Sequence, residues 1–112
     1  MEKSLFVRFF GDAPLVRILD FLMENKLFDY TKTDIARNSG ISRVSLYKVW
    51  PAFVEHKIVR VTRRIGKAKL YALNEKSPIV QQLLELDLRL SREFAERVVA
   101  HELGAKTKHA KA

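Results

Sequence analysis

The sequence predicts a mainly helical α+β domain in which several helices accompany one two-stranded β-hairpin and a long helix follows. Two patterns predict this class. Apolar residues recur every three or four positions in most of the chain, as in helices, but alternate with polar residues from 58 to 74, as in strands. The length of 112 residues and the hydrophobic content of 47% suit one domain with a hydrophobic core.

A first helix is expected over residues 13–26. The segment Gly-Asp-Ala-Pro before it is typical of a helix start, because Asp12 can cap the helix and Pro14 is tolerated in the first turn. Residues 4–10 are apolar and are compatible either with a short strand or with the first turns of a helix. The sequence leaves these two alternatives open.

Two further helices are expected over residues 32–38 and 42–56, separated by a tight turn. Thr31 followed by Asp34 resembles a capping box, with aspartate in place of the usual glutamate or glutamine. Gly40 is expected to end the first of these helices, because glycine readily adopts the left-handed conformation that often follows a helix.

Pro51 lies inside the second of these helices. A proline there removes one backbone hydrogen bond, and its ring clashes with the carbonyl of Tyr47. Residues 52–57 still follow a helical pattern, so we expect the helix to continue past the proline with any bend in its C-terminal half. Phe53 is expected in the core and Trp50 is expected to be partly covered.

Residues 58–74 predict a β-hairpin with a basic tip at Gly66-Lys67-Ala68. One face of its first strand is expected to carry Val59, Val61, Arg63 and Ile65, and the second strand resumes the alternation with Leu70, Ala72 and Asn74. The last helix is expected to start at Ser77-Pro78, since proline suits a first turn. The chain therefore divides into residues 1–76, a helix over 77–103, and a basic tail over 104–112 that is expected to be disordered.

This order of elements is that of a winged helix-turn-helix domain, in which a β-hairpin, the wing, follows two helices joined by a turn. The apolar spacing turns five residues toward the core: Ile35, Ala36, Ile41, Leu46 and Val49. Five others on the third helix then point away from the core: Ser42, Arg43, Ser45, Tyr47 and Lys48. These residue types donate hydrogen bonds to base edges and phosphates, and arginine suits guanine.

The net charge of +8 is concentrated in one part of the chain. Residues 31–74 carry ten basic and two acidic side chains, whereas residues 1–30 have a net charge of −1 and residues 75–103 one of −2. A localised basic segment is typical of a surface that binds a polyanion, so double-stranded DNA is the expected partner. Outside the third helix, the expected DNA contacts are Thr31, Lys32, Arg63, Arg64, Lys67 and Lys69.

The segments TKTDIARNSGIS and RRIGKAKLYALN are the most specific parts of this pattern. With the residues around them, over roughly 5–85, they resemble the small archaeal winged helix-turn-helix transcriptional regulators, which are related to the ArsR-type repressors. The resemblance implies a homodimer that reads DNA with the third helix, touches the DNA backbone with the wing and represses transcription. The metal-sensing cysteines of ArsR-type repressors are absent, so metal regulation does not carry over and no cofactor is expected.

The last helix is expected to form the homodimer. Its first turns, with Ile79, Leu83 and Leu84, are expected to pack on the same chain. The apolar residues beyond them are too many for a small domain to cover, and a two-fold pair buries identical faces. The expected interface residues are Leu86, Leu90, Phe94 and Val98. Glu93 and Arg97 interrupt a heptad repeat, so we expect a short antiparallel or crossed pair, which would read a roughly palindromic operator.

Two other functions are compatible with the sequence. A nonspecific architectural DNA-binding protein would use the same charges without reading bases, and a winged helix can also serve as a protein–protein interaction module. The expected function is nevertheless a sequence-specific, homodimeric transcriptional regulator, and we expect it to act as a repressor.

An enzyme is not expected. His56, His101 and His109 lie far apart in the sequence without partners at metal-ligand spacing, and the chain has no cysteine. Four carboxylates occupy helical positions that suggest ordinary surface: Asp20, Glu24, Asp87 and Glu96. No segment has the pattern of a membrane span or a cleaved signal, so a cytoplasmic protein is expected.

Overall fold

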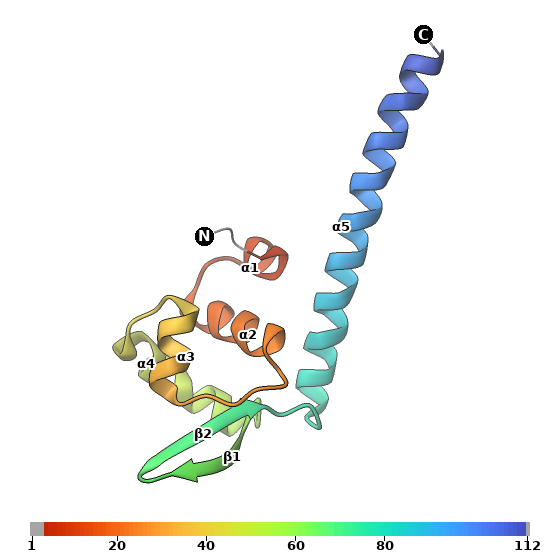
Figure 1. Ribbon diagram of the computed structural model, residues 1–112. Coiled ribbons are helices and arrows are strands. Elements are labelled where there is room, and N and C mark those ends of the chain that lie inside the picture. The colour runs from red at the N-terminus through yellow and green to blue at the C-terminus, as the bar shows by residue number, and fades with distance from the viewer. Residues whose placement is uncertain (1–3, 112) are drawn as a thin grey trace.

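The computed structural model describes the backbone of residues 4–111 and the side chains of residues 4–103. In chain order the elements are α1 (Leu5–Phe10), α2 (Pro14–Glu24), α3 (Lys32–Ser39), α4 (Arg43–Glu55), β1 (Val59–Ile65), β2 (Ala68–Leu73) and α5 (Pro78–Lys111). Figure 1 shows the other elements gathered on one side of the first half of α5, whose far end extends well beyond them. The predicted fold class, a winged helix-turn-helix followed by a long helix, is confirmed.

Residues 4–10 form a helix, which decides between the two alternatives that the sequence left open. The Ser4 hydroxyl oxygen caps α1 by accepting a hydrogen bond from the Val7 N–H at 3.1 Å. Phe6 and Val7 are buried, whereas Phe9 and Phe10 are exposed. One face of α1 therefore contributes to the core, and the other leaves two phenylalanines at the surface.

Pro14 occupies the first position of α2 as expected, but the N-cap residue is Ala13 rather than Asp12. The Asp12 carboxylate instead forms an ion pair with Arg17, one turn into α2. The Arg17 guanidinium also donates a hydrogen bond to the Gly40 carbonyl at 3.3 Å. Arg17 thus joins the start of α2 to the turn between α3 and α4.

The α3–turn–α4 unit has the caps that the sequence predicts. Thr31 Oγ1 accepts a hydrogen bond from the Asp34 N–H at 3.1 Å, and Gly40 adopts the left-handed conformation with a φ of 70°. A Cβ atom added to Gly40 would lie 2.9 Å from the Arg17 guanidinium. Both conformation and space therefore favour glycine at this turn.

α4 continues through Pro51 to Glu55, as predicted. Trp50 is only 5% exposed, so it is buried more deeply than the partial cover expected from the sequence. The reason is β2: the ring of Tyr71 meets the Trp50 ring edge-on, with 5.0 Å between the ring centroids. Phe53 lies in the core as expected and stacks on Trp50 at 5.6 Å.

The wing is an antiparallel pair of strands, but the simple alternation predicted for β1 is wrong. A bulge at Thr62 pairs Val61 with Tyr71 and Arg63 with Leu70. Because Leu70 and Tyr71 are consecutive, their partners Val61 and Arg63 lie on opposite faces of the hairpin. In β2 the four residues from Leu70 to Leu73 are all buried, since this strand also contacts α2 and α3 and pairs with Tyr30.

α5 is anchored to the core by Val80, whose side chain is fully buried, whereas Ile79 is 48% exposed. Leu83 and Leu84 pack against the core as predicted. The helix was expected to end at residue 103 before a disordered tail, whereas α5 continues to Lys111. Alanine and lysine make up most of residues 105–111, and both are strong helix formers.

Three carboxylates that looked like ordinary surface groups interact with one another where α2 faces α5. The Ser4 hydroxyl donates a hydrogen bond to Asp20 at 2.7 Å. The pKa of Glu24 is raised, mainly by partial burial and to a smaller extent by the negative charges of Asp20 and Asp87. The pKa of Asp87 is also raised, mainly by partial burial and to a smaller extent by the charge of Asp20. At neutral pH these three negative charges therefore oppose the packing of α5 on α2.

Replacing Asp87 with asparagine is expected to raise the melting temperature at pH 7 by about 2–4 °C, or about 0.5 kcal/mol after allowance for screening. The folded-state pKa of Asp87 is raised, so the folded protein gains stability as the pH falls through that pKa, and the gain is complete below the unfolded-state pKa. The advantage of Asp87→Asn should therefore shrink between pH 7 and pH ~4. Circular-dichroism melts at both pH values test this. Glu96→Gln removes an exposed carboxylate of the same helix and serves as the control. Equal melting temperatures for Asp87→Asn and the parent at pH 7 would contradict the prediction.

Candidate nucleic-acid interface

α4 has one face in the core and one at the surface. The core face is formed by Leu46, Trp50 and Phe53. At 3.6 residues per turn, the opposite face is centred on Val44, Lys48 and Pro51, and all three residues are exposed. The predicted contacts Arg43 and Tyr47, also exposed, lie along one flank of this face. We call this set of five residues the outer face of α4.

Ser42 and Ser45, which were also predicted to contact DNA, have a structural role at the start of α4. The Ser42 hydroxyl oxygen accepts a hydrogen bond from the Ser45 N–H at 3.1 Å and donates one to the Ser45 hydroxyl at 3.0 Å. Ser45 is half-buried, so Ser42 is the more accessible of the two. The pair fixes the direction in which α4 begins and thereby orients the outer face.

Val44 was missed by the sequence reasoning. Its side chain is 64% exposed at the centre of the outer face, one turn before Lys48. The prediction considered only side chains that form hydrogen bonds and therefore passed over a valine. The helical period, applied to the core residues Leu46 and Phe53, would have identified it.

A cleft of about 320 Å³ separates the N-terminus of α3 from the wing. It brings together four predicted DNA contacts from distant parts of the sequence: Thr31, Lys32, Lys67 and Lys69. The positive dipole end at the start of α3 adds to the charge of the three lysines. A cleft of this kind suits an anion such as a backbone phosphate.

Lys32 is held at one side of this cleft by three aromatic rings. Its Nζ atom lies 5.8 Å from the ring centroid of Trp50 and 5.9 Å from those of Tyr47 and Tyr71. A cation is attracted to an aromatic face at this distance. The ammonium group is therefore positioned in advance where α3, α4 and β2 meet, which lowers the entropy cost of ordering it on an anion.

Arg63 is engaged within the protein. Its Nε and Nη2 atoms donate hydrogen bonds to the Asp29 carboxylate at 2.9 and 3.2 Å, and the Thr62 hydroxyl donates to the same carboxylate. The hydrogen bonds from Arg63 and then Thr62 lower the pKa of Asp29. The structure therefore gives Arg63 a second role that the prediction did not include, since this ion pair fixes the wing to the segment before α3.

Arg64 and Lys69 are directly opposite one another near the tip of the wing, and both are exposed. Like charges at such positions destabilise a β-hairpin. A polyanion lying across the two strands would relieve this repulsion. The charge at the wing tip is therefore better suited to a bound state than to the free protein.

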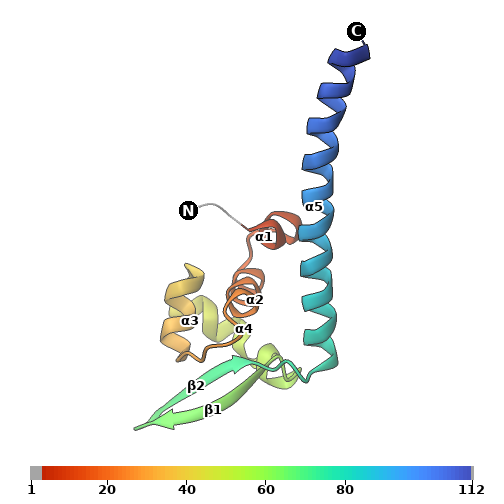
Figure 2. The same cartoon turned by 45° about the vertical axis from the view of Figure 1, so that its right-hand side comes forward.

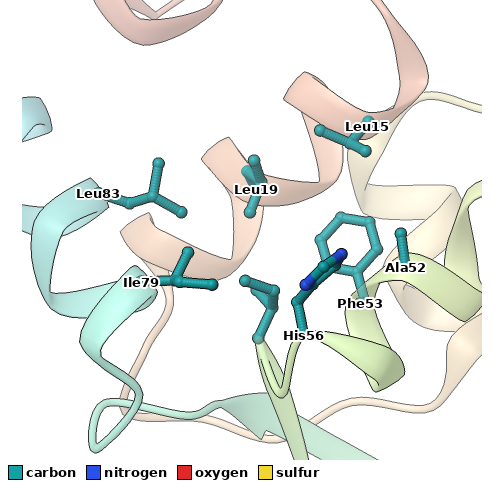
Figure 3. Close-up of a pocket in the computed structure, with 8 residues that line it drawn as sticks. Leu15, Leu19, Ala52, Phe53, His56, Ile79 and Leu83 are labelled. Carbon is teal, nitrogen blue, oxygen red and sulfur yellow. The ribbon is translucent and has the colours of Figure 1, made fainter.

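An apolar hollow of about 310 Å³ lies on another part of the molecule, where α2, the end of α4 and the start of α5 meet. Figure 3 shows around it Leu15 and Leu19 from α2, Phe53 from α4, His56 directly after α4, and Ile79 and Leu83 from α5. The His56 imidazole is the only ionisable group among its lining residues. This hollow therefore lacks the cluster of cations that the basic cleft brings together, and the basic cleft remains the candidate site.

The apolar face of α5 is only partly covered by its own chain. Leu90 packs against the core, so this predicted dimer contact already has a partner within the chain. Phe94 and Val98 lie further along the same face by the helical period and are 46% and 41% exposed. Figure 2 shows why: α1 is the last element beside α5, and the helix continues past it.

α1 adds to this uncovered surface. It contacts α5, and its Phe9 and Phe10 are 65% and 44% exposed. Leu86, the remaining predicted dimer contact, is 37% exposed on the flank of the same region. The dimer contacts predicted from the sequence all lie in the last helix, and the sequence left the conformation of residues 4–10 open.

Among the described residues, no group of three or more His, Cys, Asp or Glu side chains is arranged to hold a metal ion. In the same part of the chain, none of the helices has the length and hydropathy that crossing a membrane requires.

The fold is that of known transcription regulators. No protein-family model matches the sequence, and neither does any curated protein. Among solved structures, the antimony-specific transcriptional repressor AntR has a TM-score of 0.53 and 25% identity, over 71% of this chain and 68% of its own. MepR, a regulator of a Staphylococcus aureus multidrug efflux pump, has a TM-score of 0.61 and 16% identity, over 83% and 69%.

A third similar structure is Sso10a-2, a DNA-binding protein from Sulfolobus solfataricus, with a TM-score of 0.50 and 17% identity. The match covers 78% of this chain and 92% of Sso10a-2. At such low identity the likeness concerns the fold. The chain therefore has the winged-helix fold that these regulators and this DNA-binding protein share.

Proposed function

We propose that the protein is a homodimeric, sequence-specific DNA-binding regulator that represses transcription from a roughly palindromic operator. The observation that carries this proposal is the basic cleft, in which Lys32, Lys67 and Lys69 line a hollow next to the exposed outer face of α4. The relationship to ArsR-type repressors implied by the sequence belongs to the same proposal.

In this proposal the two surfaces have different tasks. Phosphate contacts set the register of a protein on DNA, and contacts with base edges select the sequence. The lysines of the cleft bind the phosphate backbone, while Arg43, Tyr47 and Lys48 enter the major groove from α4. Two subunits paired through α5 present two such helices to half-sites about one helical turn apart.

Selection of binding sites from random double-stranded DNA with the purified full-length protein tests this function. Enrichment of a two-fold symmetric sequence supports it. DNA binding without any enriched sequence supports the nonspecific alternative, and the absence of binding at moderate salt overturns both. Transcription from a promoter that carries the selected site then distinguishes repression from activation.

Replacing Arg43 with alanine is expected to relax discrimination at one position of each half-site. A bidentate arginine–guanine contact contributes about 1–3 kcal/mol against the wrong base, or about 5- to 150-fold. The ratio of Kd values for the selected operator and for single-base variants measures this loss. Arg89→Ala removes an exposed arginine from α5 and should leave every ratio unchanged. An unaltered base preference in Arg43→Ala would mean that Arg43 does not contact a base.

The charges of the cleft and the wing also suit a second function, that of a nonspecific architectural DNA-binding protein, because cations bind backbone phosphates without reading a base. Such a protein would use the cleft and the wing without base contacts from α4. The arginine substitution would then have no effect on base preference, while loss of lysines from the cleft would still weaken binding.

A further inference from the structure

The outer face of α4 combines polar groups with one exposed apolar side chain, Val44. A single exposed apolar residue is common on protein surfaces and has no meaning by itself. The position of Val44 is what distinguishes it, because it lies opposite the buried face of α4 and in the first turn of the helix. Its neighbours on the helix surface are Tyr47 and Lys48, three and four residues further on.

We infer that Val44 reads thymine, by packing its two methyl groups against the C5-methyl group of a thymine in the major groove. This inference rests on the proposed function. Among the four bases, only thymine offers a methyl group to the major groove, and apolar side chains recognise it by contact. The side chain is 64% exposed, so it has apolar surface to bury against a base edge.

The rest of the outer face supports this assignment. Arg43 precedes Val44 and suits guanine, and Lys48 follows one turn later with a charge suited to phosphate or guanine. Ser42 and Ser45 flank Val44, and their mutual hydrogen bond at 3.0 Å partly satisfies both hydroxyl groups. In the first turn of α4, Val44 is therefore the exposed side chain suited to apolar contact with a base. The outer face of α4 then combines recognition of guanine with recognition of thymine.

The test compares thymine with deoxyuridine, which lacks only the C5-methyl group. In the operator selected by the parent protein, each thymine is replaced in turn by deoxyuridine, and Kd is measured at fixed salt. Burial of one methyl group is worth about fourfold in affinity, so replacement at the Val44 position is expected to cost about fourfold in one half-site and about 15-fold in both. At that position, Val44→Ala, which lacks both methyl groups of the valine, should discriminate between the two DNAs less than the parent does.

The chain offers a matched control in Val54, a second exposed valine of α4 that lies in its last turn and is 52% exposed. Val54→Ala should show the same sensitivity to deoxyuridine as the parent. The inference is overturned if no thymine of the operator is sensitive in the parent, or if Val44→Ala keeps the parental sensitivity. The proposed function fails separately, and the inference with it, if selection enriches no sequence.

Discussion

A Phe94→Asp variant is expected to be monomeric and to lose most of its affinity for operator DNA. Phe94 is 46% exposed on the part of α5 that its own chain does not cover, and an aspartate there would place an unpaired charge in the proposed helix pair. Linking two binding modules raises affinity by about 10²–10⁴, so the monomer should bind weaker by a factor in this range. Sedimentation velocity and fluorescence anisotropy measure the two effects.

Ala100→Asp is the matched control for this substitution. It introduces the same charge into the same helix, at an exposed position on the side away from Phe94 and Val98 by the helical period. This variant should remain dimeric and bind like the parent. A dimeric Phe94→Asp protein would refute the assigned interface. A monomeric one with parental affinity would separate DNA binding from dimerisation.

The covered and uncovered parts of α5 explain why this helix is suited to pairing with a second subunit. Val80 and Leu83 bury the start of its apolar face in the core, and Phe94 and Val98 continue that face where no other element of the described chain lies beside it. The exposed rings of Phe9 and Phe10 on α1 adjoin this region. A second subunit could therefore bury both helices of the same surface at once, in keeping with two-fold symmetry.

Local signals made most of the fold predictable. The caps at Thr31 and Ser42, the left-handed Gly40 and the proline at the start of α2 each depend on a few neighbouring residues, and each element they delimit was predicted. The order of these elements then identified the winged helix. Pro51 did not interrupt α4, since the residues after it retain the helical pattern.

Contacts between distant residues were not predictable in this way. The Asp29–Arg63 ion pair joins residues 34 positions apart, and the bulge at Thr62 changes the face on which Arg63 lies. The carboxylates of Asp20 and Asp87 approach one another only because α5 packs beside α2. Neither a helical nor a strand period contains this information, so the sequence places these charged residues in their helices and strands but does not identify their partners.

The second large effect is expected from the lysines of the cleft and concerns the affinity for DNA. Replacing Lys67 and Lys69 together with glutamine is expected to weaken binding to all DNA sequences by about a thousandfold or more at ~0.1 M salt. The proposed homodimer would lose four cations, and each lost phosphate contact reduces the slope of log K against log salt by about 0.9. The slope should therefore become shallower by about three to four, while the selected sequence stays the same.

The same double variant has an opposite effect on the free protein. Lys69 faces Arg64 across the hairpin, so its neutralisation removes a repulsion and should leave the melting temperature equal to or above that of the parent. Loss of binding then cannot be attributed to unfolding. Lys76→Gln removes an exposed lysine outside the cleft and the wing and should change neither quantity. An unchanged salt slope in the double variant would mean that the cleft does not bind phosphate, because a charge that releases no counterion makes no contact with the DNA backbone.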